Sequence, residues 1–318
     1  MANTETKQLD AIISNRRALM VGGGALAALA LVGSTTANAQ SSVTDNDILN
    51  FALNLEYLEA NFYYAAAFGT TIDKYSTPIA ISGVGGAGVT ATVKASPKVP
   101  FTSIAVSSYC IETAIEEGKH VSLLRSALGS AAVAQPQIDL QSSFNTLASA
   151  AGIGSTFDPF LNDANFLIGA YIFEDVGVTA YHGAAGLITS SAVLGTAAGI
   201  LAVEAYHAGL VRTTINAFDP INTLGYQTLT QKISALRAKL SGAAASPVVA
   251  TANDDFGLGT QTVTLGASSG ITASTLLDAD ANAIAFSRTT SQVLSIVTGG
   301  GAGNKGVFFP AGLNGTIK

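Results

Sequence analysis

Two glutamate–histidine pairs constrain the fold of this chain more than any other feature. In each pair the histidine follows the glutamate by three positions, and a lone glutamate lies upstream of each pair. In chain order the six residues are Glu56, Glu117, His120, Glu174, Glu204 and His207. Each lies in an apolar stretch with helical periodicity, so the two members of a pair share one helix face. Four-helix bundles that hold two metal ions in their core need this ligand set.

The distribution of the remaining glutamates supports this interpretation. Beyond residue 39 the chain has seven glutamates, all on the four apolar stretches, and none follows Glu204. Two of its three histidines complete the pairs. A carboxylate in the middle of an apolar helix stripe is costly to bury unless it is paired or bound to metal. We therefore expect these side chains to be metal ligands rather than surface groups.

The sequence predicts an all-α bundle over residues 45–220. Apolar periodicity and helix-ending residues place its four helices at 48–68, 102–128, 159–188 and 190–218. The Gly-rich segment 69–101 interrupts the bundle and is predicted to be a loop or a β-hairpin. A short helix at 138–150 lies in a long connection, which a bundle needs if its second and third helices run parallel.

Residues 221–318 are predicted to form a C-terminal helical and irregular extension. Helices are expected at 228–240 and 280–297, separated by a loose region rich in Ala, Gly, Ser and Thr. The tail from residue 299 onward is Gly-rich and is predicted to be irregular.

The first 39 residues have the features of an export signal peptide. Arg16 and Arg17 precede an apolar run over 18–32, and small residues at Ala37 and Ala39 suit a signal peptidase. The arginine pair resembles a twin-arginine signal. We therefore expect an exported protein, periplasmic or extracellular, with no membrane span after cleavage.

Composition limits the classes of partner. The net charge is −6, and removal of the leader, with three basic and two acidic residues, makes it −7. Without a basic patch, nucleic acid is excluded as a partner. Only 11% of residues are charged, which indicates a large buried fraction or self-association into a homo-oligomer. Cys110 is the only cysteine, so the chain has no intrachain disulfide.

The residues around the six glutamates and histidines allow alternatives. Glu59 competes with Glu56 for the first ligand position. Glu56 is preferred because Tyr63 follows it by seven residues, as Tyr181 follows Glu174. The two tyrosines are assigned either to core packing or to a position beside the metal ions.

Three further polar residues allow two interpretations each. Glu116, four residues before His120, is either a hydrogen-bond partner of a ligand histidine or an exposed partner of Lys119. Asp175 and His182 are interpreted as flanking residues, with a place in a substrate channel as the alternative.

The chain resembles the ferritin-like superfamily, and within it the proteins related to plant desiccation-induced proteins, which also occur in bacteria. The segment 48–63, the two helices with Glu-x-x-His and the segment 308–315 carry this resemblance. It implies a carboxylate-bridged pair of iron or manganese ions that admits oxygen or hydrogen peroxide. It also implies terminal ligation by Glu56 and Glu174, bridging by Glu117 and Glu204, and one histidine on each ion.

Three functions fit these features. The first is a stress-associated, exported protein that binds two metal ions and has modest redox chemistry on oxygen or peroxide. The second is an enzyme that dismutates hydrogen peroxide as manganese catalases do. The third is a metal-free structural protein whose buried carboxylates are paired by protons or salt bridges. A ligand set alone does not decide among them.

Overall fold

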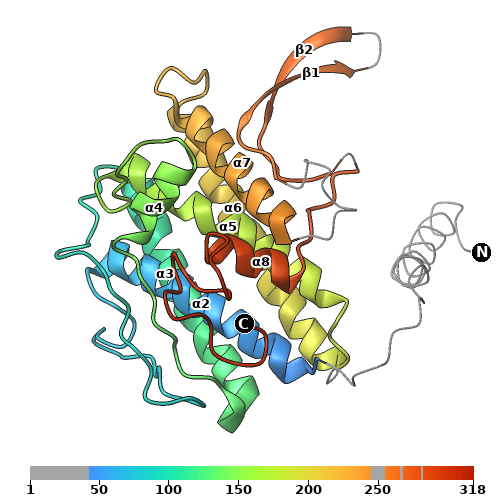
Figure 1. The fold of residues 1–318 in the computed structure, drawn as a ribbon. Coiled ribbons are helices and arrows are strands. Elements are labelled where there is room, and N and C mark those ends of the chain that lie inside the picture. Colours follow the sequence, from blue (N-terminus) through green and yellow to red (C-terminus); the bar gives the residue numbers. More distant parts are fainter. Residues whose placement is uncertain (1–42, 245–254, 266–267, 281) are drawn as a thin grey trace, which may run out of the picture. The chain divides into compact units, whose positions relative to one another are not determined.

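A computed structural model describes residues 43–244, 255–265, 268–280 and 282–318 (Figure 1). The predicted export segment, residues 1–39, lies outside these ranges. The elements are α2 (Asp45–Phe68), α3 (Ile104–Leu128), η1 (Gly129–Ala131), α4 (Ser143–Ala150), α5 (Asp163–Ala185), α6 (Ser191–Phe218), α7 (Tyr226–Ala244), β1 (Gly259–Leu265), β2 (Ser268–Thr275) and α8 (Thr290–Val297). The predicted mostly helical, ferritin-like fold is confirmed.

The four long helices α2, α3, α5 and α6 form the bundle, with α2 packed mainly on α3 and α5 mainly on α6. Every residue of α2 from Ile48 to Ala67 is buried. A helix that is buried around its whole circumference lies in the core, and α2 is therefore the central helix of the bundle. Thr44 caps its start in a capping box with Asp47, and Gly69 ends it in the left-handed conformation that glycine adopts without strain.

The two long connections of the bundle differ in structure. The insertion between α2 and α3 forms isolated bridges rather than a ladder of paired strands, and two of them join Val84 and Thr92 to the α3–α4 connection. A hairpin exists elsewhere, because β1 and β2 pair antiparallel in the segment predicted to be loose. The short helix predicted at 138–150 is α4, which begins later, at Ser143.

The last predicted helix, 280–297, is wrong over its first half. Only Thr290–Val297 is helical, because Thr289 and Gln292 form a capping box that starts α8 there. Upstream, the Asp280 carboxylate accepts hydrogen bonds from the backbone of Asn282 and Ile284 and closes a turn instead. An aspartate that caps its own backbone in this way competes with helix formation.

The C-terminal tail is irregular, as predicted, yet it packs into the core. Phe308 and Phe309 are buried, and Phe308 contacts the rings of Phe144 and Phe173. Asn54 on α2 exchanges hydrogen bonds with the Asn314 backbone, at 2.9 and 3.0 Å. These hydrogen bonds therefore hold the tail against α2, the central helix of the bundle.

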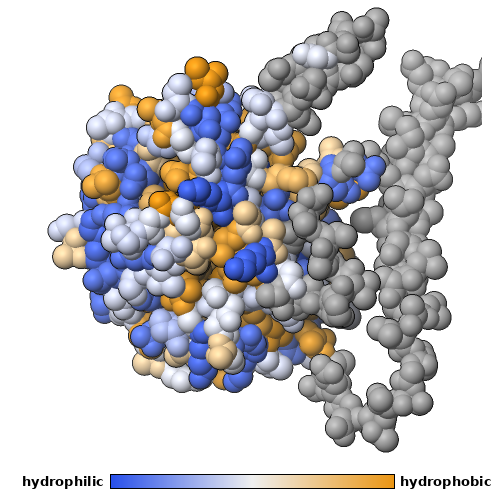
Figure 2. Space-filling view, turned by 45° about the horizontal axis from the view of Figure 1, so that its top comes forward, coloured by the Kyte–Doolittle hydropathy of each residue, from blue (hydrophilic) through white to orange (hydrophobic). Residues whose placement is uncertain are grey.

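Hydrophobic and hydrophilic residues are interspersed on the face of the molecule drawn in Figure 2. Among the described residues, α6 is the one helix long and apolar enough to cross a membrane by length and composition, and 28% of its most apolar window is buried. Glu204 and Arg212 are buried within this helix. The absence of a membrane span stays a prediction, and so does self-association.

Candidate metal centre

The six predicted residues converge from four helices on one place in the bundle core. Glu56 comes from α2, the first pair from α3, Glu174 from α5 and the second pair from α6. None of the six is more than 7% exposed. The i, i+3 spacing within each pair directs both side chains inward, so α3 and α6 each contribute two side chains from a regular helix, and α2 and α5 contribute one each.

Four of these side chains form a first group, composed of Glu56, Glu117, His120 and Glu204. One potential ligand atom from each lies within 4.8 Å of the others. His120 Nδ1 is 3.2 Å from Glu56 Oε2, 3.5 Å from Glu117 Oε2 and 3.7 Å from Glu204 Oε1. Three carboxylates and an imidazole thus surround one point.

A second group shares Glu117 with the first and adds Glu174 and His207, again within 4.8 Å. His207 Nδ1 is 3.0 Å from Glu117 Oε1 and 3.5 Å from Glu174 Oε2. Glu117 therefore turns one oxygen toward each histidine, as a bridging carboxylate would. Glu204 belongs to the first group only.

Eight buried polar atoms of this cluster have no hydrogen-bond partner among the described residues. They are Glu56 Oε2, both carboxylate oxygens of Glu117 and of Glu204, Glu174 Oε2, and Nδ1 of His120 and of His207. The imidazole nitrogens lie 3.0–3.7 Å from carboxylate oxygens of the cluster, within the distance of an ion pair. Buried polar atoms are rarely left unpaired in native proteins. This concentration of unpaired oxygen and imidazole atoms fits metal binding.

Two tyrosines complete the cluster in a symmetric way. The Tyr63 hydroxyl on α2 donates to Glu174 on α5, and the Tyr181 hydroxyl on α5 donates to Glu56 on α2. Each tyrosine thus leaves one oxygen of its carboxylate free to face the cluster. Both tyrosines lie beside the carboxylates, and both are also part of the buried core.

Glu59 is buried, at 5% exposure, but belongs to neither group. One helical turn from Glu56, it lies instead on the wall of an apolar cavity. The structure therefore places Glu56, and not Glu59, among the converging side chains.

Glu116 contacts a histidine on another helix. Its Oε2 is 2.8 Å from Nε2 of His207, on α6, so its partner is a candidate ligand histidine, as the first alternative predicted, although this histidine lies on another helix than the nearby His120. The i, i+4 spacing points Glu116 toward His120 in the sequence, but α6 lies against this part of α3 and supplies a closer imidazole. Because the Glu116 side chain is 34% exposed, this contact connects the cluster with solvent.

The charges within the cluster shift several pKa values. Burial and the Glu117 carboxylate raise the pKa of Glu56 to about 7. Burial alone would lower the pKa of His120, but contacts with Glu117 and Glu56 raise it to about 10. Burial also opposes ionisation of Glu117, yet His120 and His207 hold its pKa below the ordinary value. Without a cation, protons hold this cluster together, and binding of metal would release them.

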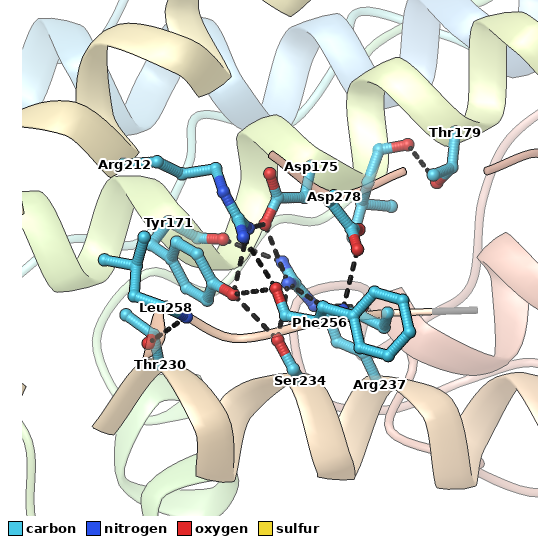
Figure 3. A network of polar contacts seen from close by, with 12 residues as sticks. Tyr171, Asp175, Thr179, Arg212, Thr230, Ser234, Arg237, Phe256, Leu258 and Asp278 are labelled. Atoms are coloured by element: carbon cyan, nitrogen blue, oxygen red, sulfur yellow. Dashed lines mark hydrogen bonds and ion pairs between the residues drawn. The ribbon is translucent and has the colours of Figure 1, made fainter. Parts of the chain in front are cut away.

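Asp175 is a residue whose role the sequence analysis missed. It was expected to flank Glu174, but it is buried and accepts charged hydrogen bonds from Arg212 at 2.7 Å and Arg237 at 2.9 Å (Figure 3). Arg237 also pairs with Asp255, as does Arg288. The network joins α5 and α6 of the bundle to α7 and to later residues of the C-terminal extension.

The acidic members of this network are a poor metal site. Asp175, Asp255 and Asp278 lie within 4.8 Å of one another, but three arginines form ion pairs with the first two, and Asp278 accepts a hydrogen bond from the backbone of Phe256. The signal in the sequence was Arg212, a charged residue one turn beyond Ala208 on the inner stripe of α6. His182, the other residue predicted to flank the site, contacts the Phe286 carbonyl through its Nδ1 at 3.1 Å and so packs on the extension.

Comparison with known proteins agrees with this geometry. The sequence profile of the ferritin-like domain matches residues 44–217, which include all four bundle helices apart from the last residue of α6. The chain belongs to the ferritin-like domain family.

Two similar proteins extend the comparison along most of the chain. A desiccation-related protein of Craterostigma plantagineum is 34% identical, over 80% of this chain and 78% of its own length. A ferritin-like catalase of Nesocodon mauritianus is 24% identical, over 86% of this chain and 84% of its own length. No solved structure matches significantly.

Proposed function

We propose that this ferritin-like protein binds two metal ions, iron or manganese, through Glu56, Glu117, His120, Glu174, Glu204 and His207. The observation that carries the proposal is the pair of side-chain groups that share Glu117, with eight buried ligand atoms unpaired. Carboxylate oxygens with one imidazole for each ion suit iron or manganese better than metals that prefer sulfur ligands. Four ionised glutamates also balance the charge of two divalent cations.

In this proposal the surrounding residues orient the ligands. Tyr63 and Tyr181 hold Glu174 and Glu56 so that their free oxygens face the cluster. Glu116 contacts Nε2 of His207, which leaves Nδ1 of that ring to face the cluster. Such partners fix the orientation and basicity of metal ligands. A bound metal pair would supply redox chemistry on oxygen or hydrogen peroxide.

Metal content tests the proposal. The mature protein is offered iron and manganese without oxygen, and bound metal is counted by plasma mass spectrometry. We expect about two ions per chain, and loss of both in a Glu117→Ala/Glu204→Ala variant. Glu112→Ala, on an exposed position of α3, is the matched control and keeps both ions. Wild-type protein without metal would refute the proposal and favour the metal-free structural protein.

A second candidate function is the dismutation of hydrogen peroxide. The similarity to a ferritin-like catalase supports it, as does the partly exposed Glu116 carboxylate, which connects the cluster with solvent. Rapid oxygen release from peroxide by manganese-loaded protein is the expected result. Metal-dependent stability without such turnover would leave metal binding in a stress-associated, desiccation-related protein as the function.

We also propose that the protein is exported through its twin-arginine-like leader. The support is the sequence of residues 1–39 alone. Replacement of Arg16 and Arg17 by lysine should keep the protein in the cytoplasm in a fractionation experiment. Export of the lysine variant at the wild-type level would contradict the proposed route.

A further inference from the structure

An apolar cavity of about 40 Å³ lies beside the proposed metal centre. Its walls come from α2, α4, α5, α7, α8 and the C-terminal tail, and include Leu58, Phe144, Phe173, Ile233 and Val297. Aliphatic and aromatic side chains form nearly all of this lining. The bundle and the C-terminal extension therefore both contribute to the walls of the cavity.

The wall between the cavity and the metal centre is thin. Glu59 lines the cavity one helical turn after Glu56, and Gly177 lines it three residues after Glu174. A Cβ atom on Gly177 would lie 2.2 Å from Oε2 of Glu204, so the glycine backbone touches that carboxylate directly. Glu59 and Gly177 thus lie both on the wall of the cavity and next to residues of the two side-chain groups.

The Glu59 carboxyl is unusual for a buried group. Within the described part of the chain, no residue forms a hydrogen bond with it, although it is 5% exposed and faces an apolar wall. Buried polar groups are usually hydrogen-bonded, so this carboxyl marks a point of the wall that an occupant of the cavity can reach.

The lining determines what the cavity can hold. A buried water needs two to four polar partners, and apolar cavities stay dry and take apolar molecules. One water needs roughly 10–15 Å³ of such space, so the cavity has room for a molecule of only a few heavy atoms. Hydrogen peroxide could form a hydrogen bond with the Glu59 carboxyl there, but it would lose most of its hydrogen bonds to water, because the rest of the wall is almost entirely apolar.

We propose that this cavity binds a small, uncharged, apolar molecule next to the metal centre, with Glu59 at the end that faces the metal ligands. Its use as a substrate site rests on the proposed function, but binding itself does not need the metal. Dioxygen belongs to this chemical class and hydrogen peroxide does not. Polar molecules would approach by way of the solvent-connected contact of Glu116 with His207.

Xenon tests the cavity directly, because it is apolar and monatomic. Crystals of the full chain, prepared without metal, are pressurised with xenon, and its anomalous signal is located. We expect a xenon peak between Glu59 and Ile233, and its loss in Ala148→Leu, which places a larger side chain in the cavity. The matched control is Ala197→Leu, an equally buried alanine that lines a separate apolar cavity of about 20 Å³. It should keep the peak.

A second variant, which enlarges the cavity, keeps the test decisive if Ala148→Leu fails to fold. Ile233→Ala removes side-chain atoms from the wall and should raise the xenon occupancy. Absence of xenon from the wild-type cavity, or ordered water within it, would overturn the inference even if two metal ions bind. Xenon binding in a protein that takes up no metal would keep the cavity and refute only the proposed function.

The loaded protein provides a second readout. In metal-loaded protein, Ala148→Leu should raise KM for dioxygen and leave KM for hydrogen peroxide unchanged. An equal effect on both substrates would contradict the selectivity proposed for the cavity.

Discussion

Substitution of Gly177 by alanine should affect metal affinity much more than the stability of the fold. Gly177 lies within α5, where alanine favours the helix by about 1 kcal/mol over glycine. The added Cβ, however, would lie 2.2 Å from Oε2 of Glu204, whereas ordinary contact begins at 3.4 Å. The carboxylate oxygen must therefore move by about 1.2 Å, the difference between these two distances.

The two effects act on different properties. The clashing atom is the far end of a flexible side chain, so rotation of Glu204 relieves the contact at little cost to the fold. Metal sites, in contrast, tolerate errors of only about 0.2 Å in ligand distances. We expect the free energy of unfolding of metal-free Gly177→Ala to stay within about 1 kcal/mol of wild type. Its metal affinity should fall by roughly 10-fold or more.

Urea unfolding in the presence of a chelator and metal titration measure the two properties. Gly199→Ala is the matched control, because it is also a helical glycine but no atom lies within 4 Å of the added Cβ. It should stabilise the protein by about 1 kcal/mol and leave metal binding unchanged. Wild-type metal affinity in Gly177→Ala would refute the assignment of Glu204 as a fixed ligand.

Three further predictions follow from the same contacts. Tyr63→Phe and Tyr181→Phe should each lower metal affinity by roughly 10-fold in a competition titration, whereas Tyr109→Phe, outside the cluster, should not. Arg237→Met leaves Asp175 and Asp255 without this buried partner and should cost about 3–5 kcal/mol in urea unfolding, against no clear change for the exposed Lys239→Met. Stability of the metal-free protein should fall as pH rises, because the folded pKa values of Glu56, about 7, and His120, about 10, exceed their unfolded values of 4.5 and 6.5. The stabilisation from protonated Glu56 is complete below pH 4.5 and is lost as pH rises through 7, and that from protonated His120 is lost between pH 6.5 and 10. Thermal unfolding with chelator present measures this, and a melting temperature that rises over that pH range would contradict the prediction.

The bundle and its converging residues were predictable because the information is local. Helical periodicity marks each bundle helix, and a spacing of three places Glu117 and His120 on one face whatever the partner helix is. Helix boundaries were predicted less well where a segment can form either a helix or a turn closed by its own side chains. Segment 280–288 has no helix-breaking residue, yet the turn closed by Asp280 excludes the helix there.

The sequence by itself determined that four apolar helices carry buried glutamates and histidines in a repeated order. It did not determine which neighbour each polar atom meets, because those neighbours are distant in the chain. α2 is buried on all sides, so periodicity cannot choose between Glu56 and Glu59, and only the positions of α3 and α6 decide. The tertiary structure likewise paired Glu116 with His207 and Asp175 with Arg212 and Arg237, because a buried charge takes whichever opposite charge the packing brings within reach.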